Sequence, residues 1–343
     1  MKGIVKESFA RGAALRRDLP DPRPGEGEVV VKVEAAAICG TDLHIYNWSP
    51  WAQARVKPPM VFGHEFAGKV VETGPYVRRF KTGDRVAGET HIACGECRQC
   101  LTGNAHNCEN MKIIGVHTPG AFADYICIPE TCGWHLDEAL SYEEGACLEP
   151  MGVAMHGLEA ARVGGKDIVI LGAGPIGLMA VGIARAHGAR RVIVSEPVQA
   201  RLDAAGRWGA THTVRPDRED LKAVVMDVTS GAGADAVIDY SGSPRAIQAG
   251  FSLIRKGGTV VLVGLPSEPI VIDVSDSVIY KEAWITGVTG RTMYGTWLEC
   301  QKVLDSGHFN IGQIIAARYP FNEFESAFED AINGIPGKVI LVP

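Results

Sequence analysis

Four cysteines gather in one short polar segment. Cys94, Cys97 and Cys100 repeat at intervals of three residues, and Cys108 follows after seven intervening residues. The C-x2-C spacing lets two thiolates turn inward on one ion, and four thiolates at tetrahedral corners suit zinc. A disulfide framework fits poorly with nine cysteines, an odd number. A bacterial ferredoxin motif would continue C-x3-C-P, which this segment does not. Because four thiolates leave no open position, the segment predicts a structural zinc rather than a catalytic one.

A second set of potential metal ligands is chemically mixed. Cys39 lies in ICGTDLHIYNW, His64 and Glu65 lie in VFGHEFAG, and Glu149 lies in CLEPMG. Cysteine, histidine and carboxylate are the ligands of catalytic zinc sites, which keep one position open. Zinc in such a site lowers the pKa of a hydroxyl, so that a hydride can leave the adjacent carbon. Each residue alone has an ordinary structural reading, for example a small buried cysteine. Beside a dinucleotide site, the set indicates an alcohol-oxidising centre.

The dinucleotide site is predicted from GAGPIG, which supplies Gly172, Gly174 and Gly177. The motif follows the apolar segment DIVIL and precedes a helical pattern, which is the context that pyrophosphate binding requires. Glu196 ends the next predicted strand, where a carboxylate accepts hydrogen bonds from ribose hydroxyls and repels a 2′-phosphate. Arg201 lies close by and would favour the opposite preference, but Glu196 occupies the deciding position. The pattern therefore predicts NAD rather than NADP.

Two kinds of secondary-structure pattern divide the chain. Up to about residue 150, short alternating stretches such as GEVVVKVEAAAIC are separated by glycine and proline, which predicts a β-rich domain. Beyond it, buried strands alternate with amphipathic helices, which predicts a doubly wound parallel sheet. The predicted class is α/β, with a β-rich domain at 1–150 completed by 293–343 and a dinucleotide-binding domain at 151–292.

Composition excludes several classes of function. The 343 residues are 46% apolar and 22% charged, with a formal net charge of -6 and interleaved signs. These values are typical of a globular protein and give no nucleic-acid footprint. No stretch approaches the roughly 18 apolar residues of a membrane helix, and no apolar segment follows the first lysine as in a signal peptide. We expect a cytoplasmic protein with a small-molecule substrate and neither a nucleic-acid nor a membrane partner.

The segments CGTDLH and GHEFAGKVVETG, the four-cysteine lobe and GAGPIG together resemble the zinc-dependent medium-chain dehydrogenases over essentially the whole chain. The resemblance implies a GroES-like catalytic domain, a Rossmann domain that binds NAD, and two zinc ions per subunit, one catalytic and one structural. It also implies a homotetramer.

The same resemblance implies individual roles. Cys39, His64 and Glu65 would bind the catalytic zinc, and Glu149 would approach it. Thr41 and His44 would relay a proton to solvent, and His91 would lie beside the substrate. The residues implied to contact NAD, in addition to the glycines, are Ile176, Glu196, Arg201, Val263, Gly264, Leu265, Val288 and Thr289.

Two branches of the family remain open for the substrate. ICGTDLHIYNWSPWAQ, GETHIACGECRQC and GVTGRTMYGTW resemble the branch that oxidises the secondary alcohol of L-threonine to 2-amino-3-oxobutanoate. Val153, however, replaces an asparagine that is common in that branch, and VAMHG resembles the polyol branch. The expected reaction is NAD-dependent oxidation of L-threonine, and the alternative is oxidation of a polyol or vicinal diol.

Overall fold

The computed structural model describes residues 1–343, which form two compact units. The first unit combines Met1–Pro150 with Ile311–Pro343, and the second is Met151–Asn310. The sequence pattern predicts the return to the first domain at residue 293, but α10 (Gly295–Asp305) still belongs to the second unit. This helix buries Trp297, Cys300 and Val303 at three-residue intervals, so one of its faces is apolar and covered.

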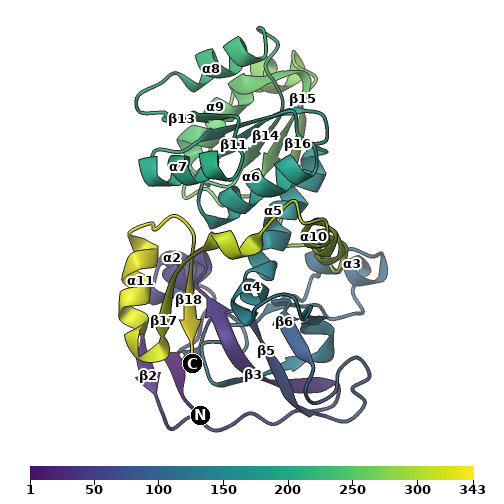
Figure 1. Ribbon diagram of the computed structural model, residues 1–343, viewed down its shortest axis with the longest axis vertical. Helices are drawn as coiled ribbons and strands as arrows, with labels where there is room; N and C mark the ends of the chain where they lie inside the picture. The colour runs from purple at the N-terminus through teal and green to yellow at the C-terminus, as the bar shows by residue number, and fades with distance from the viewer. The chain divides into compact units, whose positions relative to one another are not determined.

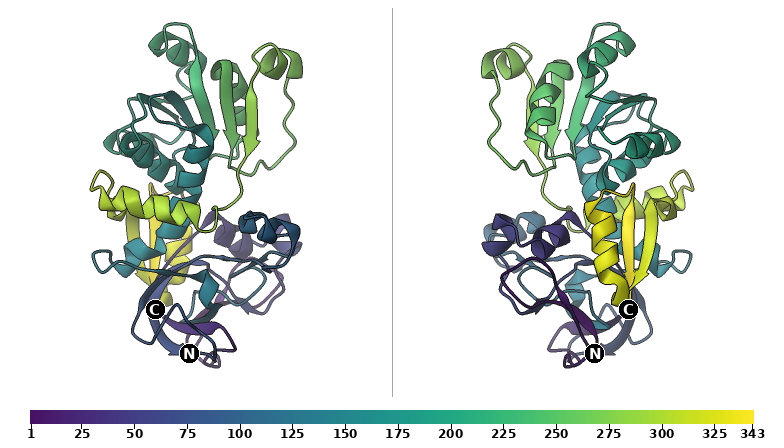
Figure 2. Two further views of the ribbon diagram at one scale, coloured as in Figure 1. Left: turned by 90° about the vertical axis from the view of Figure 1, so that its right-hand side faces the viewer. Right: turned by 90° about the vertical axis from the view of Figure 1, so that its left-hand side faces the viewer.

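A seven-stranded mixed sheet forms the centre of the first unit. Its order is β10 (Gly133–His135), β6 (Arg85–Gly88), β5 (Glu65–Thr73), β3 (Glu28–Ala37), β18 (Lys338–Val342) and β17 (Ile315–Pro320), and β9 (Tyr125–Pro129) also pairs with β3. Strands from both ends of the sequence are therefore neighbours. Figure 2 shows α11 (Phe324–Ile332) lying along β17 and β18, against which it packs.

Smaller elements surround this sheet. The three-stranded sheet has the order β2 (Ala14–Arg16), β1 (Gly3–Lys6) and β4 (Met60–Val61), and β7 (His91–Ile92) pairs with β8 (Lys112–Ile113). The short helices of the unit are α1 (Gly40–Tyr46), α2 (Pro50–Gln53), α3 (Arg98–Leu101) and α4 (Tyr142–Ala146).

The core of the first unit follows from alternation along its strands. Val29, Val31 and Val33 of β3 all belong to the main hydrophobic cluster, while on the opposite face Lys32 is exposed, although Val30 is buried there. Aromatic rings fill the space between the elements, as where Phe62 and Phe122 meet edge to face with ring centroids 5.2 Å apart. Burial of one strand face thus fixes which side chains point away from the core.

The second unit is built on a six-stranded parallel sheet. Its order is β13 (His212–Val214), β12 (Arg191–Ser195), β11 (Asp167–Leu171), β14 (Ala234–Asp239), β15 (Ile254–Leu262) and β16 (Trp284–Gly287). Numbered within the unit, this is 3-2-1-4-5-6, the doubly wound order that binds dinucleotides. All five residues of β11 are buried, as expected of a strand covered on both faces.

Helices connect these strands and cover the sheet. Figure 1 shows α6 (Pro175–Ala186) beside α7 (Gln199–Arg207), and α8 (Leu221–Val228) beside α9 (Pro244–Leu253). Ile247 and Phe251 of α9 and Val225 of α8 pack into one hydrophobic cluster with the central strands. The chain enters this unit within α5 (Leu148–Ala161), from Met151 onward. The predicted fold class, a β-rich GroES-like domain with a doubly wound parallel-sheet domain, is confirmed.

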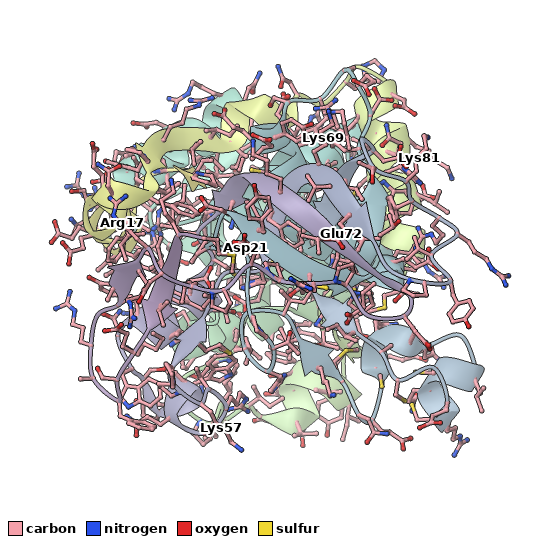
Figure 3. The ribbon with its side chains drawn as sticks, turned by 90° about the horizontal axis from the view of Figure 1, so that it is seen from below. Arg17, Asp21, Lys57, Lys69, Glu72 and Lys81 are labelled. Carbon is pink, nitrogen blue, oxygen red and sulfur yellow. The ribbon has the colours of Figure 1, made fainter.

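Charged side chains of both signs are exposed on the surface. Figure 3 shows this for the first unit, where the exposed groups Arg17, Asp21, Lys57, Lys69, Glu72 and Lys81 are labelled. No helix in the structure is both long enough and apolar enough to cross a membrane.

Candidate metal and dinucleotide sites

One end of the main sheet in the first unit collects the mixed ligands. β3 and β5 run antiparallel with Ala37 opposite Glu65, so the end of β3 and the start of β5 meet. Cys39 lies two residues beyond the end of β3, as the N-cap of α1, and His64 directly precedes β5. The ligand atoms of Cys39, His64 and Glu65 all lie within 4.8 Å of one another. Strand register therefore brings together three residues from two separate sequence segments.

A buried carboxylate oxygen without a partner shows that this cluster fits a cation. His64 is 4% and Glu65 0% exposed. Glu65 Oε1 has no hydrogen-bond partner, although buried polar atoms normally have one. The donor set of one thiolate, one imidazole and one carboxylate is that of a catalytic zinc site. The residues present therefore fit the zinc ion that their types predict.

The pKa values of the cluster reflect burial and the charges of neighbouring groups. Burial lowers the pKa of His64, but Asp42 and Cys39 raise it, and the net pKa lies well above the ordinary value. Burial raises the pKa of Glu65, with a contribution from nearby Glu149, and only Lys338 and His64 oppose it. A divalent cation would stabilise both the thiolate and the carboxylate in this pocket.

Asp42 contacts two residues of the cluster, Cys39 and His64. It is fully buried, its Oδ2 accepts the backbone N–H of Cys39 at 2.9 Å, and its Oδ1 lies 3.5 Å from His64 Nδ1. A carboxylate behind a histidine fixes the ring and its tautomer, leaving the other ring nitrogen for metal. The sequence contains a signal for Asp42, because an acidic residue three positions after a helix N-cap commonly accepts that residue's N–H.

The other predicted residues of the first unit are placed individually. Thr41 and His44 lie on α1 three positions apart, hence on one helix face, with Thr41 half-buried and His44 exposed. Glu149 is 5% exposed but is not part of the three-residue ligand cluster. His91 Nδ1 lies 3.3 Å from Oε1 of the wholly buried Glu89, which also accepts the His91 backbone N–H at 2.9 Å. Sequence reasoning did not single out Glu89.

The four-cysteine lobe forms a second cluster of ligands. Sγ–Sγ distances are 3.5 Å for Cys97–Cys100, 3.9 Å for Cys97–Cys108 and 3.5 Å for Cys94–Cys108. Hydrogen bonds from backbone N–H groups, that of Glu96 foremost, lower the pKa of Cys94 to about 6. All nine cysteines of the chain are free thiols. Four sulfurs at these separations surround a space suited to one ion.

The second unit contains the predicted dinucleotide turn between β11 and α6. A Cβ at Gly177 would lie 2.0 Å from the carbonyl oxygen of Gly172, so only glycine allows this close packing. A Cβ at Gly174 would meet nothing within 4 Å. Gly177 is therefore required by packing within the fold, whereas Gly174 leaves open space where a pyrophosphate can approach the helix N-terminus.

A cavity of about 770 Å³ adjoins this turn. It is lined by Gly172, Gly174, Glu196, Arg201 and Arg245, among others. Glu196 is 3% exposed, and its Oε2 accepts the Ala173 N–H at 2.8 Å while its Oε1 accepts the Val198 N–H at 3.1 Å. Arg201 Nη1 lies 3.7 Å from Glu196 Oε1. The carboxylate is thus fixed at the strand end, where a ribose would contact it.

The remaining predicted cofactor residues lie at or beyond strand ends. Val263, Gly264 and Leu265 follow β15, and Val288 and Thr289 follow β16. Ile176 lies in the first turn of α6. None of these six lines the cavity just described, but ligands of doubly wound sheets bind beyond the carboxyl ends of the strands, where five of them lie.

Together, the doubly wound sheet, its glycine turn and the mixed ligand cluster define the class of nucleotide-dependent oxidoreductases that use a metal. Residues 25–138 match the alcohol dehydrogenase GroES-like domain family, and residues 175–306 match the zinc-binding dehydrogenase family. The chain is 43% identical to an L-threonine 3-dehydrogenase of Caldanaerobacter subterraneus subsp. tengcongensis, over 100% of this chain and 99% of the relative.

Comparison with solved structures indicates the same family of dehydrogenases. A zinc-binding dehydrogenase from Sinorhizobium meliloti, described as putative and bound to NADP, is 31% identical with a TM-score of 0.90, covering 100% of this chain and 99% of that one. The 2R,3R-butanediol dehydrogenase of Bacillus subtilis is 26% identical with a TM-score of 0.90, at the same coverage. The chain belongs to the zinc-dependent medium-chain alcohol dehydrogenases. It is an enzyme, and its cofactors are zinc and a nicotinamide dinucleotide.

Proposed function

We propose that the protein oxidises the secondary alcohol of L-threonine to 2-amino-3-oxobutanoate, with NAD as the hydride acceptor. The observation that carries the choice of substrate is the 43% identity to an L-threonine 3-dehydrogenase along the whole length of both chains. The mixed ligand cluster and the glycine turn supply the two chemical components that this oxidation needs.

Zinc held by Cys39, His64 and Glu65 would supply Lewis-acid polarisation of the substrate hydroxyl, and a second zinc in the lobe would be structural. The residues of the chain move the proton. Thr41 would accept the hydroxyl proton as it gives its own towards His44, one helical turn further and exposed, which would pass a proton to water. The hydrogen at C3 would leave as a hydride, with the electron pair of its bond, and NAD would accept it, so the products would be the ketone, NADH and one proton.

NAD is proposed over NADP because of Glu196. The carboxylate is buried and held by two backbone N–H groups, so it cannot move away from an added 2′-phosphate without losing both hydrogen bonds. A phosphate there would be repelled. Arg201 offers a positive charge in the same cavity, but it already lies beside Glu196.

The alternative is a polyol or vicinal-diol dehydrogenase. Val153 favours it, because a half-buried valine on α5 cannot offer the hydrogen bonds of the asparagine common in the threonine branch. The butanediol dehydrogenase among the similar structures is consistent with this alternative, at 26% identity.

One comparison of substrates tests both proposals. NADH formation is followed with L-threonine, L-allo-threonine, sorbitol, xylitol and 2,3-butanediol. A kcat/KM for L-threonine at least about a hundredfold above the others, equivalent to roughly 3 kcal/mol of transition-state binding, supports the first proposal. Turnover of the diols without turnover of threonine supports the alternative. The variant V153N is expected to raise the preference for threonine in either case.

We further propose that copies of the chain associate into a homotetramer. β16 is an edge strand of its sheet, with Trp284 72% and Ile285 43% exposed, and Ile279 and Tyr280 just before it are also exposed. An unprotected apolar edge strand is a template for pairing with another strand. Light scattering should report an oligomer, and W284R should shift it towards smaller species. A monomeric wild-type protein would contradict the proposal.

A further inference from the structure

Lys338 lies buried directly against a predicted metal ligand. Its Nζ donates hydrogen bonds to Glu65 Oε2 and, at 3.1 Å, to the carbonyl oxygen of Ile38. The side chains of Lys338 and Glu65 are 3% and 0% exposed. The strands fix this pairing, because Ala37 of β3 lies opposite both Glu65 of β5 and Ile340 of β18. The ammonium is therefore a built part of the site.

The two oxygens of Glu65 have different surroundings. Oε2 accepts from Lys338, whereas the buried Oε1 has no hydrogen-bond partner. A ligand atom of Glu65 lies within 4.8 Å of those of Cys39 and His64. The carboxylate thus has one oxygen for the ammonium and one for the metal. An ammonium bonded to a carboxylate attracts its charge and weakens it as a donor to a second cation.

The charge balance of the pocket supports the same conclusion. The thiol of Cys39 and the carboxylate of Glu65 offer up to two negative charges to one divalent ion, and the charge of nearby Glu149 acts on Glu65. The ammonium of Lys338, bonded to Glu65 Oε2, offsets part of this negative charge.

We propose that Lys338 is a positioning residue that keeps Glu65 a displaceable ligand of the catalytic metal, so that Glu65 yields its place when the substrate hydroxyl arrives. The inference rests on the proposed zinc site. A positioning role and a purely structural role of Lys338 predict opposite effects of its removal on metal binding. If Lys338 only stabilised the site, its removal would loosen the metal. If Lys338 competes with the metal for Glu65, its removal tightens the metal and slows the reaction.

The test uses the full-length protein with cobalt in the catalytic site. K338M removes the charge and both hydrogen bonds, and K338Q removes the charge while it keeps a donor. The matched control is K6M, because Lys6 is 0% exposed and donates to the carbonyl oxygens of Ala10, Gly12 and Tyr46 but to no ligand. The measurements are the rate of cobalt loss to excess chelator and the change in its visible absorption when a secondary alcohol is added.

Both Lys338 variants should release cobalt roughly tenfold more slowly than the wild type, the factor that one charged hydrogen bond is worth. They should also show a smaller spectral response to the alcohol and a lower kcat. K6M should release cobalt at the wild-type rate. Faster or unchanged release from folded K338M and K338Q would overturn the inference.

A measurement on the wild type covers the case in which neither variant folds. Crystals of the zinc-loaded protein without alcohol should show Glu65 bound to the metal. Crystals with a bound alcohol should show Glu65 paired only with Lys338. Glu65 bound to the metal in both states would overturn the inference alone. A wild type that holds metal only in the lobe would contradict the proposed catalytic site itself, so the two failures are distinguishable.

Discussion

Asp42 Oδ1 lies 3.5 Å from His64 Nδ1, and both atoms are buried without a hydrogen-bond partner. The other Asp42 oxygen accepts the N–H of Cys39. One carboxylate therefore contacts two of the three residues of the mixed cluster. Their relative orientation depends on a side chain that does not belong to the cluster.

The variant D42N should weaken catalytic zinc binding by about 10–100-fold, because asparagine can still accept from Cys39 but no longer offers a charge behind His64. Competition with a chromophoric chelator measures the affinity. The control is D84N, since Asp84 accepts the N–H of Lys81 three residues earlier, as Asp42 does for Cys39, but belongs to neither ligand cluster. Equal zinc affinities for D42N and the wild type would contradict the role given to Asp42.

Two glycines of one motif should respond differently to alanine. G177A would place a Cβ 2.0 Å from the Gly172 oxygen and should lower the free energy of unfolding by about 1–3 kcal/mol. G174A meets nothing within 4 Å and should change stability by less than about 1 kcal/mol. It should nevertheless weaken NADH binding at least tenfold, because the methyl group occupies the approach of the pyrophosphate. Calorimetry and NADH fluorescence separate the effects, and tight NADH binding by G174A would refute the assignment.

Removing the charge of Glu196 should change the cofactor preference. E196Q should have a roughly tenfold lower kcat/KM with NAD, because it loses one charged hydrogen bond. Its kcat/KM with NADP should rise, because the repulsion of the 2′-phosphate disappears. Glu219 lines the same cavity, so E219Q is the matched control and should keep the wild-type preference. A wild type that prefers NADP would overturn the choice of NAD.

Asp167 should make part of the stability depend on pH. Hydrogen bonds from Arg190, together with charge attraction to Arg191 and Arg190, hold the pKa of this buried carboxyl below its ordinary value of 3.8. Its contribution is therefore present above that pH and lost as the pH falls through the lowered value. D167N should be less stable than the wild type by roughly 1–3 kcal/mol at pH 7.

Denaturant titration from pH 7 down to about pH 2 measures this dependence, and the difference between D167N and the wild type should shrink at the acid end. D217N is the control, because Asp217 pairs with Arg215 at the surface and should have little effect at any pH. A difference that stays constant with pH would exclude ionised Asp167 as its cause.

The fold was predictable wherever local pattern decides it. The run DIVIL and the glycines after it predict a buried strand, a turn and a helix, and β11, the turn at Gly172 and α6 have those positions. The return to the first unit was not predictable to the residue. A helix such as α10 has the same amphipathic pattern whichever unit it covers, and only packing assigns it.

The candidate site likewise contains residues that the sequence predicts and one that it does not. Cysteine, histidine and carboxylate types identify Cys39, His64 and Glu65, which the structure brings together. Lys338 carries no sequence signal, because a lone lysine near a strand is usually exposed. It reaches Glu65 only through the pairing of β18 with β3, a contact between residues far apart in the chain. Such partners depend on register, which local patterns do not specify.

The position of β18 also affects the order in which the protein can be assembled. β3 is complete at Ala37, but its partner Ile340 emerges from the ribosome roughly 300 residues later, about 15–60 s at usual rates of synthesis. The second unit is continuous from Met151 to Asn310 and can close its own sheet during that interval. The earliest part of the chain is therefore the last to finish folding. Because β9 pairs only with residues 28–32 on that edge of β3, a nascent chain keeps the Ala36–Ala37 end unpaired until translation passes β18, and this end is where a chaperone would be needed.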